Sequence, residues 1–332
     1  MPAEHIVHLS NQKSFVAVPG TSLLDAAALA GLMLEHSCRS GRCGNCKAQL
    51  ISGQVQSLQP DLALSPAQQA DGWVLTCAVE ACSNVQLALN DLGGELKLMK
   101  LPARLDALDR PAADVLRLSL RLPPNSGFKY LAGQHIELLG ADGIRRSYSL
   151  ASAPQADGKL ELHIRRVDGG AMSEYWFMAA KVNDLLRFEG PRGSFFLRDV
   201  TGLDLVFLAT GTGIAPIKAM LESLALRPAD AQPRSIELYW GGRRPEDLYW
   251  TPPGMVAGVI PLSYIPVLSQ ADPHWQGARG HVQQELLRRH AVLNHAAVYA
   301  CGSSAMIHNA RSSLQLAGLP ESSFYSDAFV SA

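Results

Sequence analysis

The chain has 332 residues, of which 47% are hydrophobic and 18% are charged, and its formal net charge is −1. This length exceeds one ordinary core and predicts two or three domains. The balanced charge gives no reason to expect nucleic acid as a partner. No apolar run approaches the roughly 18 residues that would span a membrane, and the first ten residues show no secretion signal. We therefore expect a cytoplasmic protein.

Charge is uneven along the chain. Residues 1–93 hold four basic and seven acidic side chains, and the remainder is close to neutral. An acidic domain suits a redox module that docks through complementary charge. Ordinary surface variation explains an imbalance of this size equally well.

The first 90 residues predict a small mixed domain. Residues 6–18 suggest two short strands, and Thr21 and Ser22 can cap a helix over residues 23–32. A loop rich in glycine, serine and cysteine follows over residues 37–46, and residues 47–51 and 85–89 suggest further strands. Residues 91–94 (Asp-Leu-Gly-Gly) predict a linker that lets domain 1–93 swing between two redox partners.

Four of the six cysteines form a spaced set within this domain. Cys38, Cys43 and Cys46 follow the pattern C-x4-C-x2-C, and Cys77 comes later. This is the spacing of plant-type [2Fe–2S] ferredoxins, in which thiolates converge from one loop on two irons. Structural zinc is the main alternative, but a second short C-x2-C pair is missing. A disulfide scaffold does not suit the expected compartment. The cysteines therefore predict a [2Fe–2S] cluster, with Cys82 outside the pattern.

Two further domains follow in the pattern of strands. Within residues 100–200, short strands at 115–122, 135–139, 146–150, 160–167 and 185–189 predict an antiparallel barrel, with a helix at 172–180. Within residues 201–332, apolar strands at 205–209, 236–240 and 298–300 each precede glycine, which predicts a doubly wound parallel sheet. The expected fold is thus multidomain, α+β and α/β: a β-grasp ferredoxin domain, a barrel and a nucleotide-binding domain.

A flavin motif lies at the edge of the expected barrel. The run Arg146-Ser147-Tyr148-Ser149 resembles the RxYS motif of the ferredoxin–NADP reductase superfamily. The resemblance implies that Arg146 holds the FAD pyrophosphate as a forked cation. It places Tyr148 along the flavin and Ser149 near flavin N5, where hydride arrives.

The resemblance extends downstream. Arg165 matches a strand that adds FAD contacts, and Gly170, Met172 and Ser173 match the start of a phosphate-binding helix, where helix N-termini attract phosphate. Residues 190–195 (Gly-Pro-Arg-Gly-Ser-Phe) resemble another superfamily signature. The alternative is an ordinary strand with an exposed arginine.

A nicotinamide motif follows the flavin motif. Gly211, Thr212, Gly213 and Pro216 belong to a GTGIAP turn that opens a helix and resembles the turn of the same superfamily. Glycines at such a turn let the dinucleotide pyrophosphate approach the backbone.

Three further features bear on the nicotinamide. Cys301 and Gly302 match the superfamily position beside nicotinamide and flavin, although a small buried thiol at a strand end is the alternative. Phe329 is the candidate C-terminal aromatic over the flavin, and core packing explains it equally well. Arg243 and Arg244 follow the strand that usually faces the adenosine ribose, where arginine favours NADPH. Many NADH-using relatives are also basic here, and we expect NADH.

The order of motifs resembles reductases that carry ferredoxin, FAD and NAD domains in this sequence. Such an oxidoreductase takes hydride from NADH, passes electrons through FAD to the [2Fe–2S] cluster and then to an acceptor enzyme. Two groups compete: reductase components of aromatic-ring or phenol oxygenases, and the CDP-6-deoxyglucoseen reductase group. The second supplies electrons to a sugar dehydratase, the CDP-4-keto-6-deoxyglucose 3-dehydrase of deoxysugar synthesis.

The match to the second group is closer and spans the whole chain. It rests on residues 120–124, 130–134, 145–149, 299–303 and 324–330. His36 departs from the pattern, because relatives often carry an aromatic residue there. A non-catalytic redox-sensing or scaffold module is the alternative of another class, and the intact cofactor motifs argue against it.

Overall fold

A computed structural model describes residues 4–94, 96–140, 143–256, 258 and 260–329. The chain divides into two compact units, Met1–Lys97 with Gly193–Phe195, and Leu98–Arg192 with Phe196–Ala332. Within the described residues, no helix combines the length and the apolar character needed to cross a membrane.

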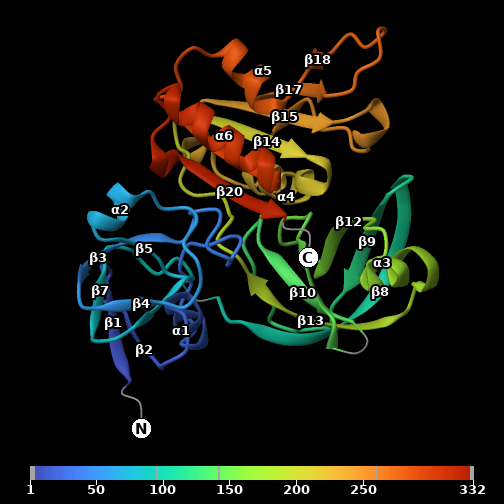
Figure 1. Cartoon of the computed structure of the whole chain (residues 1–332). Helices are drawn as coiled ribbons and strands as arrows, with labels where there is room; N and C mark the ends of the chain where they lie inside the picture. The colour runs from blue at the N-terminus through green and yellow to red at the C-terminus, as the bar shows by residue number, and fades with distance from the viewer. Residues whose placement is uncertain (1–3, 95, 141–142, 257, 259, 330–332) are drawn as a thin grey trace. The chain divides into compact units, whose positions relative to one another are not determined.

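The first unit is a mixed sheet covered by a helix, drawn in blue to cyan in Figure 1. The strand order is β2-β1-β7-β3-β5, and β1 pairs parallel with β7 while the other pairs are antiparallel. Helix α1 starts where Ser22 Oγ accepts a 3.1 Å hydrogen bond from the Asp25 amide. It ends earlier than expected because Gly31 adopts a left-handed φ of 76°. The elements are β1 His5–Leu9, β2 Ser14–Ala17, α1 Leu23–Leu29, β3 Lys47–Ser52, β4 Val55–Ser57, α2 Pro66–Ala70, β5 Trp73–Leu75, β6 Val79–Ala81 and β7 Val85–Leu87.

The linker begins inside this unit. Asp91 accepts hydrogen bonds from the Met33 amide at 2.6 Å and the Gly93 amide at 3.1 Å, and pairs with Lys13 Nζ at 2.5 Å. The Asp91 side chain is 2% exposed. These bonds fix the start of the predicted linker to the loops of the first unit that hold Met33 and Lys13. Swinging of this unit stays a prediction.

The second unit begins with an antiparallel barrel, green in Figure 1. Its strand order is β11-β10-β13-β8-β9-β12, and a bridge between Leu150 and Leu162 joins the two ends. Leu118, Ile136 and Phe188 are fully buried in its core. The expected helix at 172–180 is a single α-turn that continues into a π-helix. The elements are β8 Met99–Ala112, β9 Val115–Arg121, β10 His135–Leu139, β11 Arg145–Ser149, β12 Lys159–Arg165, α3 Ala171–Glu174, η2 Tyr175–Ala179 and β13 Leu185–Arg192.

A mostly parallel sheet completes this unit, with strand order β16-β17-β15-β14-β19-β20 and β18 paired to β17; the edge strand β16 alone of the pairs in this order runs antiparallel to its neighbour, β17. Helix α4 covers one face, and α5 and α6 pack on the other (Figure 1). The chain leaves β14 toward β15 and later returns to β19 on the other side of β14, so the carboxyl ends of β14 and β19 form the topological switch point, where such sheets bind ligands. The elements are β14 Asp204–Thr210, η3 Gly211–Gly213, α4 Ile214–Ala225, η4 Ala229–Ala231, β15 Ser235–Gly242, η5 Pro245–Asp247, β16 Met255–Val256, β17 Ile260–Leu268, β18 Ala278–Arg279, α5 Val282–Arg289, β19 Ala296–Ser303, α6 Ser304–Leu316, η6 Glu321–Ser323 and β20 Phe324–Phe329.

Candidate functional site

The four spaced cysteines come together as two pairs. Cys46 Sγ lies 3.2 Å from Cys77 Sγ, and the thiols of Cys38 and Cys43 share a hydrogen bond. Within the described residues, no three histidine, cysteine or acidic side chains surround a single point as one metal ion requires. Two thiol pairs suit a two-iron cluster, in which each iron takes two cysteine ligands. The residues therefore fit a [2Fe–2S] cluster.

The loop that carries these cysteines curls so that its amides face sulfur. The Ser40 amide lies 3.5 Å from Cys38 Sγ, and the amide of Asn45 faces Cys43. Hydrogen bonds from Cys43 and from backbone amides lower the pKa of Cys38 to about 4, although burial opposes them. Gly41 has a φ of 70°, and a Cβ there would overlap the Pro60 carbonyl oxygen. Glycine is thus required for the close wrap, and amide donors stabilise negative sulfur.

The flavin motif occupies strand β11 at the edge of the barrel. Arg146 is exposed, Tyr148 is half-buried and Ser149 is 8% exposed, directly opposite His135 of β10. The Tyr148 hydroxyl accepts a 3.1 Å hydrogen bond from Trp176 Nε1 of the π-helix. Burial raises the pKa of Tyr148, so its hydroxyl stays protonated. An exposed guanidinium beside a fixed aromatic ring fits the phosphate and ring system of FAD.

The predicted phosphate-binding helix start lies nearby. Gly170 is the N-cap of α3, and Met172 and Ser173 are buried in that turn. Ser173 Oγ accepts a 2.9 Å hydrogen bond from the Val167 amide. The Ser173 hydroxyl therefore stabilises the turn. A direct contact between this hydroxyl and phosphate stays a prediction.

The glycine turn follows β14 at the switch point. Gly211 and Gly213 bound the short helix η3, Thr212 is buried, and Pro216 is buried in the first turn of α4. A Cβ on Gly213 would overlap the Cys301 carbonyl oxygen. The turn thus packs directly on β19, which leaves its outer backbone for a dinucleotide pyrophosphate.

Cys301 and Gly302 support this turn from the end of β19. Cys301 is fully buried, and burial raises its pKa, with Asp327 adding to the effect. A Cβ on Gly302, whose φ is 155°, would overlap Thr210 Oγ1. The backbone of Cys301 thus lies directly behind the glycine turn, and a contact of its buried thiol with nicotinamide stays a prediction. Phe329 ends β20 opposite Ser303 and is 38% exposed; Val330 lies outside the described residues.

Arg165 lies beside the glycine turn. Its Nε donates to Asp114 Oδ2 at 2.8 Å and its Nη2 to Asp247 Oδ1 at 3.3 Å. A Cβ on Gly211 would come within 2.7 Å of Arg165 Nη1. These partners turn Arg165 toward the nucleotide-binding sheet, and the predicted FAD contact stays a prediction.

A cavity of about 430 Å³ opens next to this arginine, after strand β15. It is lined by Ala112, Ala113, Asp114, Arg243, Arg244, Glu246, Asp247 and Gln270. Two arginines and three carboxylates therefore meet where the sequence predicts the adenosine ribose.

Sequence patterns did not reveal several side chains that hold these parts together. Trp176, Asp247 and Lys218 belong to no motif. Lys218 carries the one available signal, because it is a lysine inside a helix whose other inward positions are apolar.

Comparisons with known proteins agree with this architecture. Residues 7–82 match the 2Fe-2S iron-sulfur cluster binding domain, 102–197 the oxidoreductase FAD-binding domain and 207–312 the oxidoreductase NAD-binding domain. The chain is 42% identical to CDP-6-deoxy-L-threo-D-glycero-4-hexulose-3-dehydrase reductase of Yersinia pseudotuberculosis, over 94% of each chain. It is 33% identical to terephthalate 1,2-dioxygenase reductase component 2 of Comamonas sp, over 98% of this chain and 97% of the other. The structure resembles the Amycolatopsis cytochrome P450 reductase GcoB with a TM-score of 0.75 and 28% identity, over 98% of both chains.

Fold and sites together define an NAD(P)H-dependent iron–sulfur flavoprotein reductase, an enzyme with 2Fe-2S, FAD and NAD-binding domains. Its relatives are reductases that serve dehydrase or oxygenase partners. The chain belongs to the ferredoxin–NADP reductase superfamily, in the group of reductases with an N-terminal 2Fe-2S domain.

Proposed function

We propose that this reductase supplies electrons to a dehydrase acting on a CDP-linked 4-keto-6-deoxyhexose. The supporting observation is 42% identity along nearly the whole chain to a reductase named for that dehydrase, against 33% for the terephthalate dioxygenase reductase component. A cytoplasmic setting accompanies this proposal, since cluster cysteines must remain reduced thiols to bind iron.

Electrons enter through the second unit. We assign pyrophosphate binding of NADH to Gly211, Thr212, Gly213 and Pro216, with Cys301 and Gly302 behind them. FAD, when bound, accepts hydride and releases electrons one at a time. Its assigned holders are Arg146, Tyr148, Ser149, Arg165, Gly170, Met172 and Ser173, with Phe329 as the aromatic cover.

Electrons leave through the first unit. We assign Cys38, Cys43, Cys46 and Cys77 as ligands of the [2Fe–2S] cluster. Amides that face the sulfurs favour the reduced, more negative form of the cluster, so this loop influences the reduction potential of the cluster. The acidic character of residues 1–93 suits a basic docking face on the acceptor.

A direct comparison of acceptors tests the proposal. The holoenzyme is mixed with NADH and either a CDP-hexulose 3-dehydrase with its sugar or a terephthalate-type oxygenase with its substrate. We expect deoxygenated CDP-sugar, seen by mass spectrometry, to account for the NADH consumed, with no oxygenase product. Oxygenated product without dehydrase turnover would contradict the proposal and favour the role of an oxygenase reductase component.

A further inference from the structure

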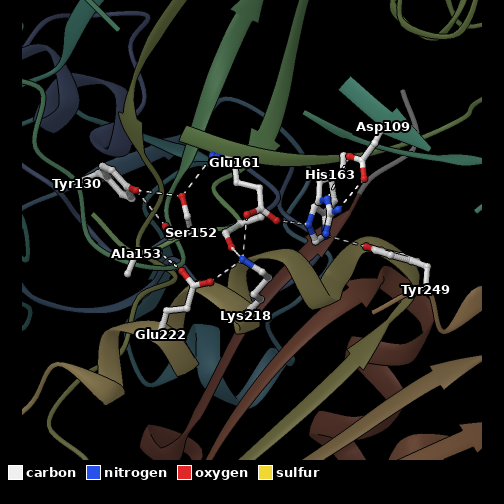
Figure 2. Close-up of polar contacts among 11 residues, drawn as sticks. Asp109, Tyr130, Ser152, Ala153, Glu161, His163, Lys218, Glu222 and Tyr249 are labelled. Atoms are coloured by element: carbon white, nitrogen blue, oxygen red, sulfur yellow. Dashed lines mark hydrogen bonds and ion pairs between the residues drawn. The ribbon is translucent and has the colours of Figure 1, made fainter. Parts of the chain in front are cut away.

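Strand β12 belongs to the barrel, and some of its side chains contact the nucleotide-binding part of the second unit. Its even positions, Leu160, Leu162 and Ile164, are buried in the barrel core. Because side chains alternate along a strand, the odd positions share the opposite face. The odd position Glu161 meets Lys218 of α4, and His163 Nδ1 lies 3.0 Å from the Tyr249 hydroxyl (Figure 2).

Lys218 lies at the centre of these contacts. Its Nζ lies 2.6 Å from Glu222 Oε1 and 3.0 Å from Glu161 Oε2 (Figure 2). It also lies 3.1 Å from the Ala151 carbonyl oxygen. Three acceptors use all three protons of the ammonium group. Lys218 is only 9% exposed, so these charge-assisted bonds are largely shielded from water.

The acceptors themselves are fixed. Glu161 Oε1 lies 2.8 Å from His163 Nε2. Burial alone would raise the pKa of Glu161, but His163 and Lys218 outweigh it, so the pKa is lowered. Glu161 therefore stays ionised opposite the ammonium. Glu222 Oε2 accepts a 3.0 Å hydrogen bond from the Ala153 amide, so α4 is attached a second time to the segment after the flavin motif.

The position of Lys218 in the chain makes this network relevant to chemistry. Ala151 comes two residues after Ser149, the candidate neighbour of flavin N5. Lys218 comes five residues after Gly213, little more than one turn of a rigid helix away from the pyrophosphate turn. Because the helix is rigid, any movement of Lys218 relative to Glu161 and Ala151 also moves the glycine turn relative to the flavin strand β11.

We propose that Lys218 is a positioning residue for hydride transfer, which sets the glycine turn against the flavin strand through Glu161, Glu222 and Ala151. This inference rests on the proposed flavin and nicotinamide sites. NADH is held by the nucleotide-binding sheet, whereas hydride transfer also requires the barrel. Loss of the network therefore lowers the rate of transfer and leaves binding largely intact.

The test is anaerobic stopped-flow reduction of the FAD-loaded enzyme by NADH, comparing wild type with Lys218→Met. We expect the limiting rate of flavin reduction to fall about tenfold or more, since misplacement by about 1 Å can cost on the order of 100-fold. The NADH dissociation constant should stay within about threefold of wild type, because the contacts that hold NADH on the nucleotide-binding sheet are unchanged. The absorbance band of the nicotinamide–flavin charge-transfer complex should weaken in parallel.

Two further variants separate the role of the network from a general effect of substitution on this part of the protein. Glu161→Gln keeps size and a hydrogen bond but removes one charge, so it should fold and show a smaller fall in the limiting rate. Lys159→Met is the matched control, because Lys159 lies on the same strand and pairs with Asp106 outside the network. It should behave as wild type.

The outcomes are distinct. An unchanged limiting rate in Lys218→Met and Glu161→Gln overturns the inference, as does weaker NADH binding at an unchanged rate. Loss of bound FAD in both Lys218→Met and Glu161→Gln would show that the network only supports the structure of the barrel, and would also overturn the inference. Failure of wild-type flavin to be reduced by NADH would instead overturn the flavin and nicotinamide assignments themselves.

Discussion

Trp176 Nε1 donates a 3.1 Å hydrogen bond to the Tyr148 hydroxyl, and the two rings meet edge to face with centroids 6.3 Å apart. Trp176 is 2% exposed and comes from the π-helix, whereas Tyr148 belongs to the flavin motif. The π-helix therefore fixes the orientation of the aromatic side chain proposed to lie along FAD.

Removing this bond should weaken FAD binding. Trp176→Phe loses a net contribution of about 1 kcal/mol, which corresponds to a roughly fivefold higher FAD dissociation constant. Fluorescence titration of the FAD-free protein measures it. Tyr148→Phe breaks the same bond, so the double variant should show less than the sum of the two effects. Trp275→Phe removes an indole bonded to the Ala278 carbonyl and serves as control; an equal loss there would contradict the assignment.

Substitution of a cluster ligand should separate the two halves of the electron path. In Cys43→Ser, cytochrome c reduction should drop to background because the two-iron cluster loses a ligand, while anaerobic bleaching of flavin by NADH continues. Absorbance of the cluster and of the flavin reports both events. Cys82→Ser should retain both, because Cys82 is exposed and outside the spaced set. Loss of flavin reduction in a folded Cys43→Ser protein would count against the proposed path.

The parts of the site that sequence could predict are those carried by short contiguous runs. The cysteine loop, the strand around Tyr148 and the glycine turn at Gly211 each combine local geometry with chemistry within a few residues. The order of these motifs then predicted the three kinds of sheet, which the comparisons confirmed.

Tertiary pairing explains what sequence could not predict. Strand β8, Met99–Ala112, contains two prolines and pairs with β9 and β13, so its extended form depends on partners distant in sequence. Lys218 and Glu161 are 57 residues apart, and their contact exists only once α4 packs against β12. Likewise, a helical pattern at 172–180 does not reveal the π-helix that brings Trp176 to Tyr148.

Asp91 should stabilise the first unit in a pH-dependent manner. Burial raises the pKa of Asp91, but Lys13 and the amides of Met33 and Gly93 outweigh it and hold the pKa below its ordinary value. Because the folded-state pKa is the lower one, this stabilisation is complete above the unfolded-state pKa of about 3.9. It is lost as the pH falls through the folded-state value.

Asp91→Asn should therefore cost about 1–2 kcal/mol of unfolding free energy at neutral pH. The difference from wild type should shrink below about pH 4, where wild-type Asp91 also becomes neutral. Urea unfolding followed by the visible circular dichroism of the cluster reports on this unit alone. Asp71→Asn, at an exposed position, should have no such effect. A difference that grows in acid would contradict the assignment.

Gly213 should tolerate no side chain. In Gly213→Ala the added Cβ meets the Cys301 carbonyl oxygen, a backbone atom that cannot rotate away. The turn must shift from β19, so we expect NADH to reduce the flavin at least about tenfold less efficiently. Gly254→Ala is the control, because nothing lies within 4 Å of its added Cβ. If folded Gly213→Ala reduced its flavin with wild-type kinetics, the glycine turn would not be part of the NADH-binding site.

The cavity after β15 should favour NADH over NADPH. Asp247 Oδ2 accepts hydrogen bonds from the amides of Arg243 and Arg244, at 2.7 and 3.2 Å, and with Asp114 and Glu246 it places carboxylates beside both arginines. A 2′-phosphate would meet these like charges. Asp247→Asn keeps the acceptor oxygen and removes one charge, so kcat/KM for NADPH should rise about fivefold, equivalent to roughly 1 kcal/mol. Steady-state assays with both coenzymes measure this, with exposed Asp230→Asn as control. A wild-type enzyme that uses NADPH better than NADH would show that the arginines, rather than the carboxylates, dominate this cavity.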